Sequence, residues 1–393
     1  MRIASHMTAV AALTFSAWLP VARGETLDEA LSRAGKLEEE ARFADVVRVL
    51  EPFAANADGE LAFRLAQAHL FAVVNGVDVK DAAGLDTKEA RDWLDRAIEL
   101  GNPMAYQLLY MVYQRGFGVP VDIDKAVQYL RHGVERNDPG AKLNLAVLAY
   151  EGIPPVEQDT NLAAQYFVEL ARGERPNMVA VYYLGVIMFK GEAGMPRDEK
   201  GGLEMIETAA TQGVIDAERD MGKANEYGWA GREPELPASL QWYEKAASKG
   251  DGFSLWRIGL VYARGEYGSV DSQRAVEHFR QAAENGSRNG MTSLGVMYAT
   301  GAGVGQDFGE ARRWYERAAE NGDAQAMNNL AVMYARGEGV EVDLVRAYGL
   351  AIRAHHAGNN EAATLIGLIE PNMTAVQLED ARQQSAAAKP RAP

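Results

Sequence analysis

The chain has 393 residues, 47% of them hydrophobic and 24% charged, which is enough for two or three ordinary domains or for one elongated array of repeated units. Its formal net charge of −15 argues against nucleic acid and anionic membrane surfaces as partners, because both carry negative charge. The sequence contains no cysteine, which excludes disulfides, thiolate catalysis and cysteine-ligated metal, and its 39 glycines point to many tight turns.

Residues 1–24 have the pattern of a cleavable signal peptide. Arg2 precedes an apolar stretch from Met7 to Leu19, which is shorter than the roughly 20 residues that a helix needs to span a bilayer. The small residues Ala22 and Gly24 suit cleavage after Gly24, and an uncleaved anchor is the alternative. We therefore expect a periplasmic or secreted protein with no membrane insertion after cleavage.

Residues 25–86 are predicted to form an N-terminal cap. An amphipathic helix is expected over 27–41, and the segments 42–50 and 61–66 resemble a helix hairpin of the tetratricopeptide type. A stacked array needs such an end, because an uncovered terminal unit exposes its stacking face.

Residues 87–370 are predicted to form about eight helix-hairpin units of about 36 residues. The residue in the turn between the two helices of each unit recurs every 36 to 39 residues, at Gly101, Asn137, Pro176, Gly213, Gly250, Gly286, Gly322 and Gly358. A second glycine follows 15 residues later, at Gly116, Gly152, Gly191, Gly228, Gly265, Gly301 and Gly337. Glycine and asparagine suit a helix end in the left-handed region, so both series predict helix C-termini.

Side-chain size repeats with the same period. The second helix carries a small residue four positions after the turn residue, such as Ala326, and an aliphatic residue four positions further on, such as Leu330. The first helix carries a bulky pair, such as Trp314-Tyr315, which is predicted to belong to the core. An acidic residue precedes most first helices and is predicted to be the N-cap: Asp122, Asp159, Asp198, Asp271, Asp307 and Asp343.

The C-terminal end of the chain differs from the repeats. Residues 371–385 are predicted to form a capping helix, and residues 386–393, rich in Ala, Pro and Lys/Arg, are predicted to be a disordered tail.

The unit from Ala311 to Val340 resembles the Sel-1-like repeat, a relative of the tetratricopeptide repeat. The residues that carry the resemblance are Trp314, Tyr315, Ala318, Ala319, Gly322, Ala326, Leu330, Tyr334, Gly337, Gly339 and Val340. The resemblance covers about residues 87–369 and implies an all-α fold, a right-handed solenoid of antiparallel helix hairpins. It also implies that exported members resemble adaptors in envelope or exopolysaccharide assembly, or regulators that hold the outer domain of a membrane sensor.

The sequence contains no recognisable catalytic, cofactor-binding or metal-ligating constellation. The histidines show no ligand spacing, and His278, at the tryptophan position of its unit, is predicted to be a packed core residue. The segment Gly301 to Gly305 lacks the preceding strand that a nucleotide-binding loop requires, so its glycines are assigned to the turn between units.

The positions that the repeat leaves free are the candidate partner-binding surface. On the first helices, the residues nine and five positions before the turn residue share one face and vary between units: Gln128, His132, Glu204, Thr208, Gln241, Lys245, Glu277, Gln281, Arg313, Arg317, Gly349 and Arg353. The first helices of tetratricopeptide-like arrays line a concave face, so the resemblance implies that these residues border a groove. Trp256, Tyr182 and Asn328 on second helices form a rival patch, with Trp256 as its anchor.

The sequence therefore predicts an extracytoplasmic scaffold that holds a protein partner, needs no cofactor and catalyses no reaction. The alternative is a module that binds glycan or peptidoglycan through exposed aromatic side chains. An envelope enzyme has little support, because cysteine-rich relatives that look like penicillin-binding proteins carry Cys pairs that this chain lacks.

Overall fold

The computed structural model describes residues 26–75, 86–266 and 268–387. The predicted signal peptide, its cleavage point and residues 388–393 of the predicted tail lie outside these ranges. Within them every regular element is a helix, which confirms the all-α prediction. The described residues form two compact units that divide within α10 (Glu199–Thr211), between Met205 and Ile206.

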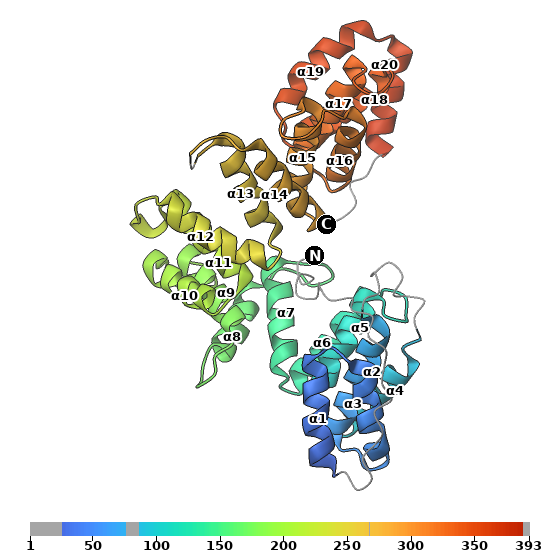
Figure 1. Ribbon diagram of the computed structural model, residues 1–393, viewed down its shortest axis with the longest axis vertical. Coiled ribbons are helices and arrows are strands. Elements are labelled where there is room, and N and C mark those ends of the chain that lie inside the picture. Colours follow the sequence, from blue (N-terminus) through green and yellow to red (C-terminus); the bar gives the residue numbers. More distant parts are fainter. Residues whose placement is uncertain (1–25, 76–85, 267, 388–393) are drawn as a thin grey trace. The chain divides into compact units, whose positions relative to one another are not determined.

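The N-terminal unit begins with the elements expected for the cap. The helices α1 (Leu27–Glu39), α2 (Phe43–Leu50) and α3 (Gly59–Val74) follow one another, with a 3₁₀ segment over Glu51–Asn56. Helix pairs then alternate along the chain: α4 (Lys88–Glu99), α5 (Met104–Arg115), α6 (Ile123–Glu135), α7 (Pro139–Glu151), α8 (Thr160–Leu170) and α9 (Met178–Lys190). Each helix packs on the next, so this unit is a stack of hairpins (Figure 1).

The C-terminal unit continues the same pattern. Its helices are α11 (Ile215–Tyr227), α12 (Leu236–Ser248), α13 (Gly252–Arg264), α14 (Ser272–Glu284), α15 (Arg288–Thr300), α16 (Phe308–Glu320), α17 (Ala324–Arg336), α18 (Leu344–His356), α19 (Glu361–Ile369) and α20 (Ala375–Ala387). From α4 to α18, even-numbered helices are the first helices of the predicted units and odd-numbered helices are the second. Odd-numbered neighbours such as α13 and α15 also pack directly on one another, so the odd-numbered helices form the inner layer of the stack.

The helix ends lie where the two turn series predict them. The seven glycines of the second series have φ between 63° and 73° and are left-handed C-caps of odd-numbered helices. The turn residues of the first series, Asn137 among them, also have positive φ, with the exception of Pro176. In that lengthened turn Gly173 takes the positive φ, at 104°. Both glycine series are therefore confirmed, because these positions require the left-handed region.

The six predicted N-cap aspartates are also confirmed. In each case a side-chain oxygen accepts a hydrogen bond from the backbone N–H three residues later, at 2.9 or 3.0 Å. These bonds satisfy one otherwise unpaired amide in the first turn of every such helix. Capping accounts for the regular spacing of the aspartates without a metal.

The core is built from aromatic rings that fill spaces left by missing Cβ atoms. In α15, a Cβ added to Gly295 would lie 2.6 Å from the ring of Tyr315 on α16, and an added Cβ on Gly259 of α13 would lie equally close to the ring of Phe279 on α14. Both rings are at most 3% exposed. We call this position, nine residues after the turn residue in each odd-numbered helix, the socket; it is a glycine in α9, α11, α13, α15 and α19.

The bulky pair of the first helix is only partly core. Tyr315 is buried as predicted, whereas Trp314 beside it is half-buried. His278, which takes the tryptophan position in α14, is also half-buried, so the prediction of a packed core histidine was wrong. Its ring lies 5.4 Å from that of Tyr262, and its Nδ1 lies 2.9 Å from the carbonyl oxygen of Arg274. The first residue of the pair therefore sits at the edge of the core and the second at its centre.

Filling a socket should break the stack at that repeat. We expect Gly295→Leu to lower the free energy of unfolding by at least about 2 kcal/mol, because the new side chain must displace the Tyr315 ring. Gly367 holds the same position in α19, where nothing lies within 4 Å of an added Cβ. Gly367→Leu is the matched control and should be neutral or stabilising, because leucine is the better helix former. Urea denaturation followed by circular dichroism measures both variants, and equal losses of stability would contradict the socket.

Candidate partner-binding surface

The structure places the first-helix candidates on the outer faces of even-numbered helices. In the N-terminal unit Gln128 and His132 are exposed on α6, and Glu204 is exposed on α10. In the C-terminal unit the exposed candidates lie in pairs, one turn apart, on α12, α14 and α16: Gln241 and Lys245, Glu277 and Gln281, Arg313 and Arg317. Odd-numbered helices lack such a face, because neighbouring helices cover them on most sides. Within each unit these candidates thus share the surface that repeat packing leaves free.

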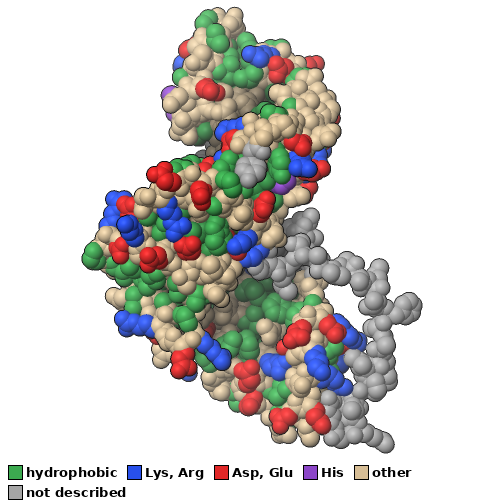
Figure 2. All heavy atoms as spheres, turned by 60° about the vertical axis from the view of Figure 1, so that its left-hand side comes forward, with side chains coloured by type: hydrophobic (Ala, Val, Ile, Leu, Met, Phe, Trp, Pro, Cys, Tyr) green, Lys and Arg blue, Asp and Glu red, His purple; other side chains and the backbone are tan. Residues whose placement is uncertain are grey.

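Several of the exposed cations are held over tryptophan rings. The Nζ atom of Lys245 lies 3.8 Å from the ring centroid of Trp242, and the guanidinium of Arg317 lies 4.5 Å from that of Trp314. Such cation–π contacts contribute about 0.5–1 kcal/mol at exposed sites and restrict the side chain. On the face drawn in Figure 2, acidic and basic side chains are interspersed. The outer faces of α12 and α16 thus present oriented cations among charges of both signs.

One candidate position is covered by the protein itself. Gly349 on α18 is buried, because α20 packs along α18 and buries Ala381 completely (Figure 1). A Cβ added to Gly349 would lie 3.4 Å from the carbonyl oxygen of Ala381. The prediction that Gly349 is free surface is therefore wrong, and Arg353 is half-buried. The contact shows that the outer face of an even-numbered helix can hold another helix.

The rival patch of Trp256, Tyr182 and Asn328 on the second helices is largely shielded from solvent. Tyr182 and Asn328 are 7% and 6% exposed, so their assignment to a binding patch was wrong. Trp256 is half-buried in α13, with its ring 5.5 Å from that of Phe253 and its Nε1–H donating to Ser293 Oγ at 3.1 Å. Trp256 thus contacts the next repeat, because Ser293 lies on α15.

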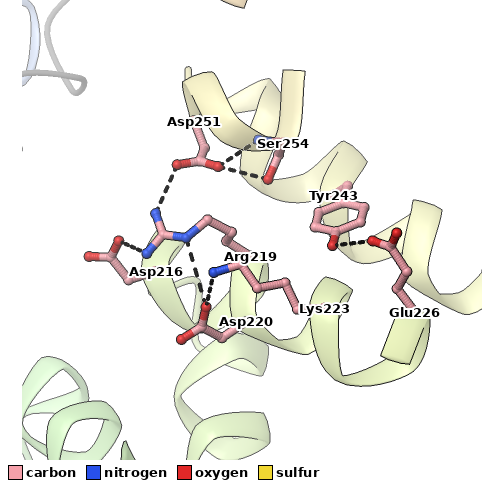
Figure 3. A network of polar contacts seen from close by, with 8 residues as sticks. All are labelled: Asp216, Arg219, Asp220, Lys223, Glu226, Tyr243, Asp251 and Ser254. Carbon is pink, nitrogen blue, oxygen red and sulfur yellow. Dashed lines mark hydrogen bonds and ion pairs between the residues drawn. The ribbon is translucent and has the colours of Figure 1, made fainter. Parts of the chain in front are cut away.

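An ionic network joins α11 to α12 and α13 (Figure 3). Arg219 is only 6% exposed and pairs with Asp216, with Asp251 at 3.0 Å and with Asp220 at 3.8 Å. Lys223 shares Asp220 at 2.9 Å. The network was not predicted from the sequence, because the position of Arg219 is polar in several other repeats, such as Gln107 and Asn328, and so does not stand out.

The same junction holds a second polar cluster around Glu226. Tyr243 donates to Glu226 at 2.7 Å, and Arg257 bridges Glu226 and Glu266 at 2.7 and 2.6 Å. Burial, and then the hydrogen bond to Glu226, raise the pKa of Tyr243, so the phenol stays protonated and donates. Burial acts to lower the pKa of Arg257, but its hydrogen bonds to Glu266 and Glu226 outweigh that effect and the pKa is raised. The cluster joins α11, α12 and α13 through two ion pairs of Arg257 and the hydrogen bond of Tyr243.

The described residues hold no candidate metal centre and no candidate membrane span. No group of three or more His, Cys, Asp or Glu side chains among them is arranged to hold a metal ion. Across residues 26–75, 86–266 and 268–387, none of the helices has the length and apolar character needed to cross a bilayer.

Removing the buried cation should weaken the α11–α13 junction. We expect Arg219→Met to cost about 3 kcal/mol, because it leaves the carboxylates of Asp216, Asp220 and Asp251 without their guanidinium. The control is Arg313→Met, which removes a side chain that is 69% exposed and should change stability by less than about 0.5 kcal/mol. Urea midpoints compare the variants, and indistinguishable midpoints would refute a structural role for the network.

A family model described as "Sel1 repeat" matches the chain eight times, over residues 59–102, 104–138, 139–173, 179–214, 215–251, 252–287, 289–323 and 324–359. Each matched repeat starts at or close to an odd-numbered helix, so in the family's own register the odd-numbered helix comes first. The expectation that the even-numbered faces border a concave groove therefore loses its basis in helix order. The outer faces of the even-numbered helices stay candidate binding surfaces because their side chains are exposed, whichever helix of the repeat comes first.

Curated relatives share about half of the chain. Chitin synthase regulatory factor 2 of Schizosaccharomyces pombe is 23% identical over 187 residues, 46% of this chain and 36% of that protein. The chitin synthase regulator SKT5 of Saccharomyces cerevisiae is 27% identical over 188 residues, 46% of this chain and 27% of that protein. An uncharacterized protein of Neisseria meningitidis serogroup B is 28% identical over 193 residues, 49% of this chain and 38% of that protein. The chain thus spans less than two-fifths of the length of these relatives.

Two solved structures match the fold as well as the sequence. A protective antigen of uropathogenic Escherichia coli with an SLR fold has a TM-score of 0.59 and 27% identity, covering 87% of this chain and 78% of that one. A Sel1 repeat protein from Oxalobacter formigenes has a TM-score of 0.51 and 27% identity, covering 63% of this chain and 96% of that one. The eight matched repeats and these folds confirm the resemblance found in the sequence: the chain belongs to the Sel1 repeat family.

Proposed function

We propose that the protein is a non-catalytic scaffold that holds a partner protein on the outer faces of its even-numbered helices. The observation that carries the proposal is the packing of α20 on α18, in which one such face already binds a helix. The equivalent faces of α12, α14 and α16 are exposed and differ from one another in charge. A partner segment would there meet different side chains at each repeat, which gives the surface its specificity.

The relatives support the scaffold class. Two of those described above are named as regulators of chitin synthase, so their names describe action through another protein. This chain matches only part of each, and we propose no chitin-related role from that match. An adaptor in envelope assembly and a regulator of a membrane sensor both fit the same surface.

The glycan-binding alternative has less support than the scaffold, because it needs exposed aromatic side chains. Among the described aromatic residues only Tyr227 is largely exposed, at 60%, whereas the other described Trp and Tyr residues are buried or half-buried. Stacking on a sugar needs an open aromatic face. Tryptophan fluorescence that responds to cell-wall or exopolysaccharide fragments at micromolar concentration would favour this alternative over the scaffold.

We also propose that the protein is exported, on the strength of the apolar N-terminal stretch and the small residues before Glu25. We expect the mature chain to begin at Glu25 and to be released with the periplasmic or secreted fraction of a bacterial host. Cell fractionation and mass spectrometry of the intact protein measure both. A full-length chain that stays in the cytoplasm would contradict export.

Charge reversal should locate the binding face. With the purified protein as bait, crosslinking in an extract of the native cells should identify a defined partner, whose affinity is then measured with purified components. We expect Arg313→Glu combined with Arg317→Glu to weaken binding at least about tenfold, the loss for 1.4 kcal/mol. The matched control combines Arg264→Glu and Arg336→Glu, which reverses two exposed arginines on odd-numbered helices. Loss of binding in the control alone would overturn the proposed face, and no partner at micromolar concentration would overturn the scaffold.

A further inference from the structure

The socket of each odd-numbered helix is normally closed by the even-numbered helix that follows. In α15 the residues Met291 and Thr292, five and six positions after the turn residue, are at most 8% exposed, and the socket Gly295 receives the Tyr315 ring. In α17 the equivalent residues Met327 and Asn328 are at most 6% exposed. The stacking face of an odd-numbered helix is thus an interface wherever another even-numbered helix follows.

The last odd-numbered helix, α19, has the same face without the covering helix. Ala363, Thr364 and Gly367, at the same three positions, are exposed, and nothing lies within 4 Å of a Cβ added to Gly367. Leu368, the next residue, is 66% exposed. The helix that follows in the chain, α20, packs on α18 instead, which leaves the α19 face open (Figure 1).

The occupied sockets show what fits the open one. Where the socket residue is glycine, as in α11, α13 and α15, the following helix inserts an aromatic ring, from Tyr243, Phe279 and Tyr315 respectively. An alanine follows each ring three positions later in the sequence and is fully buried. Where the socket residue is Ala331, in α17, the corresponding residue of α18 is the small Ala351. In α9 the socket residue Gly185 instead lies against Gly202 of α10. From α11 to α15, glycine in the socket goes with an aromatic ring in the following helix.

We propose that the open socket of α19 binds an amphipathic helix of a partner protein that carries Phe or Tyr with alanine three residues later. The ring would enter at Gly367, the alanine would allow the two helices to approach, and apolar residues beside them would cover Leu368. This contact continues the interface that the repeats already make. The helix from a second copy of this chain is disfavoured, because the rings named above are already inserted in their own sockets. The site is separate from the outer faces of α12 to α16 and does not depend on them.

A labelled copy of α16 provides the probe. A fluorescein-labelled peptide of residues 308–321, held helical by a hydrocarbon staple on its solvent face, is titrated with the whole protein and followed by fluorescence anisotropy. We expect saturable binding that is weakened at least tenfold by Tyr315→Ala in the peptide. Gly367→Leu and Leu368→Glu in the protein should each cause a similar loss. Val376→Glu is the matched control on α20, where the side chain is 79% exposed, and it should leave binding unchanged.

The results of these experiments distinguish a partner helix from a second copy of this chain on the α19 face. Absence of saturable binding, or binding that Gly367→Leu and Leu368→Glu leave unchanged, would overturn the proposal. A dimer in sedimentation equilibrium that Gly367→Leu dissociates would show that a second copy covers the face, and would overturn the assignment to a partner protein. Circular dichroism and urea midpoints establish that both variants are folded. Binding through the Arg313 face is measured independently, so failure of one proposal leaves the other standing.

Discussion

From α11 to α16 the stack depends on the contact between an aromatic ring and a glycine of the preceding helix. A Cβ at Gly259 or Gly295 would lie 2.6 Å from the ring of Phe279 or Tyr315, so the ring occupies the space of the missing side chain. This brings the backbone of the odd-numbered helix close to the even-numbered helix and buries both ring and helix. The odd-numbered helices thereby become the inner layer, and one face of each even-numbered helix is left to solvent.

The division between the two layers decides which residues are available for binding. Side chains of the inner layer, such as Asn328 and Tyr182, are buried even though their identity varies between repeats. Side chains on the outer faces, such as Gln281 and Arg317, vary without any such constraint. The open face at α19 has the same origin. This helix belongs to the inner layer, but α20 packs on α18 and leaves the stacking face of α19 uncovered.

The junction between α11 and α13 combines the Tyr243 ring in its socket at Gly222 with buried ion pairs. A buried ion pair adds little net stability compared with apolar packing, but removal of one partner is costly because the other charge remains desolvated. Arg219 and Arg257 each neutralise more than one carboxylate, and Tyr243 adds a hydrogen bond to Glu226. The joint therefore depends on all its members at once, whereas an apolar joint tolerates single changes of similar volume.

The sequence by itself determined the local structure. Left-handed glycines such as Gly337, capping aspartates such as Asp307 and the spacing of small and large residues depend on contacts within one turn of the chain, so a single repeat contains all the information. It also identified the family, because eight units reinforce one another.

Only the tertiary structure decided which faces are free. Burial of Asn328, the half-buried edge position of Trp314 and the pairing of Arg219 with Asp251 depend on residues about one repeat or more away, and so does the covering of Gly349 by α20. Nothing in the local pattern of α20 distinguishes packing on α18 from packing on α19. The surfaces of α18 and α19 that compete for α20 exist only after the repeats have stacked. Packing of α20 on α18 leaves Gly367 and Leu368 of α19 exposed.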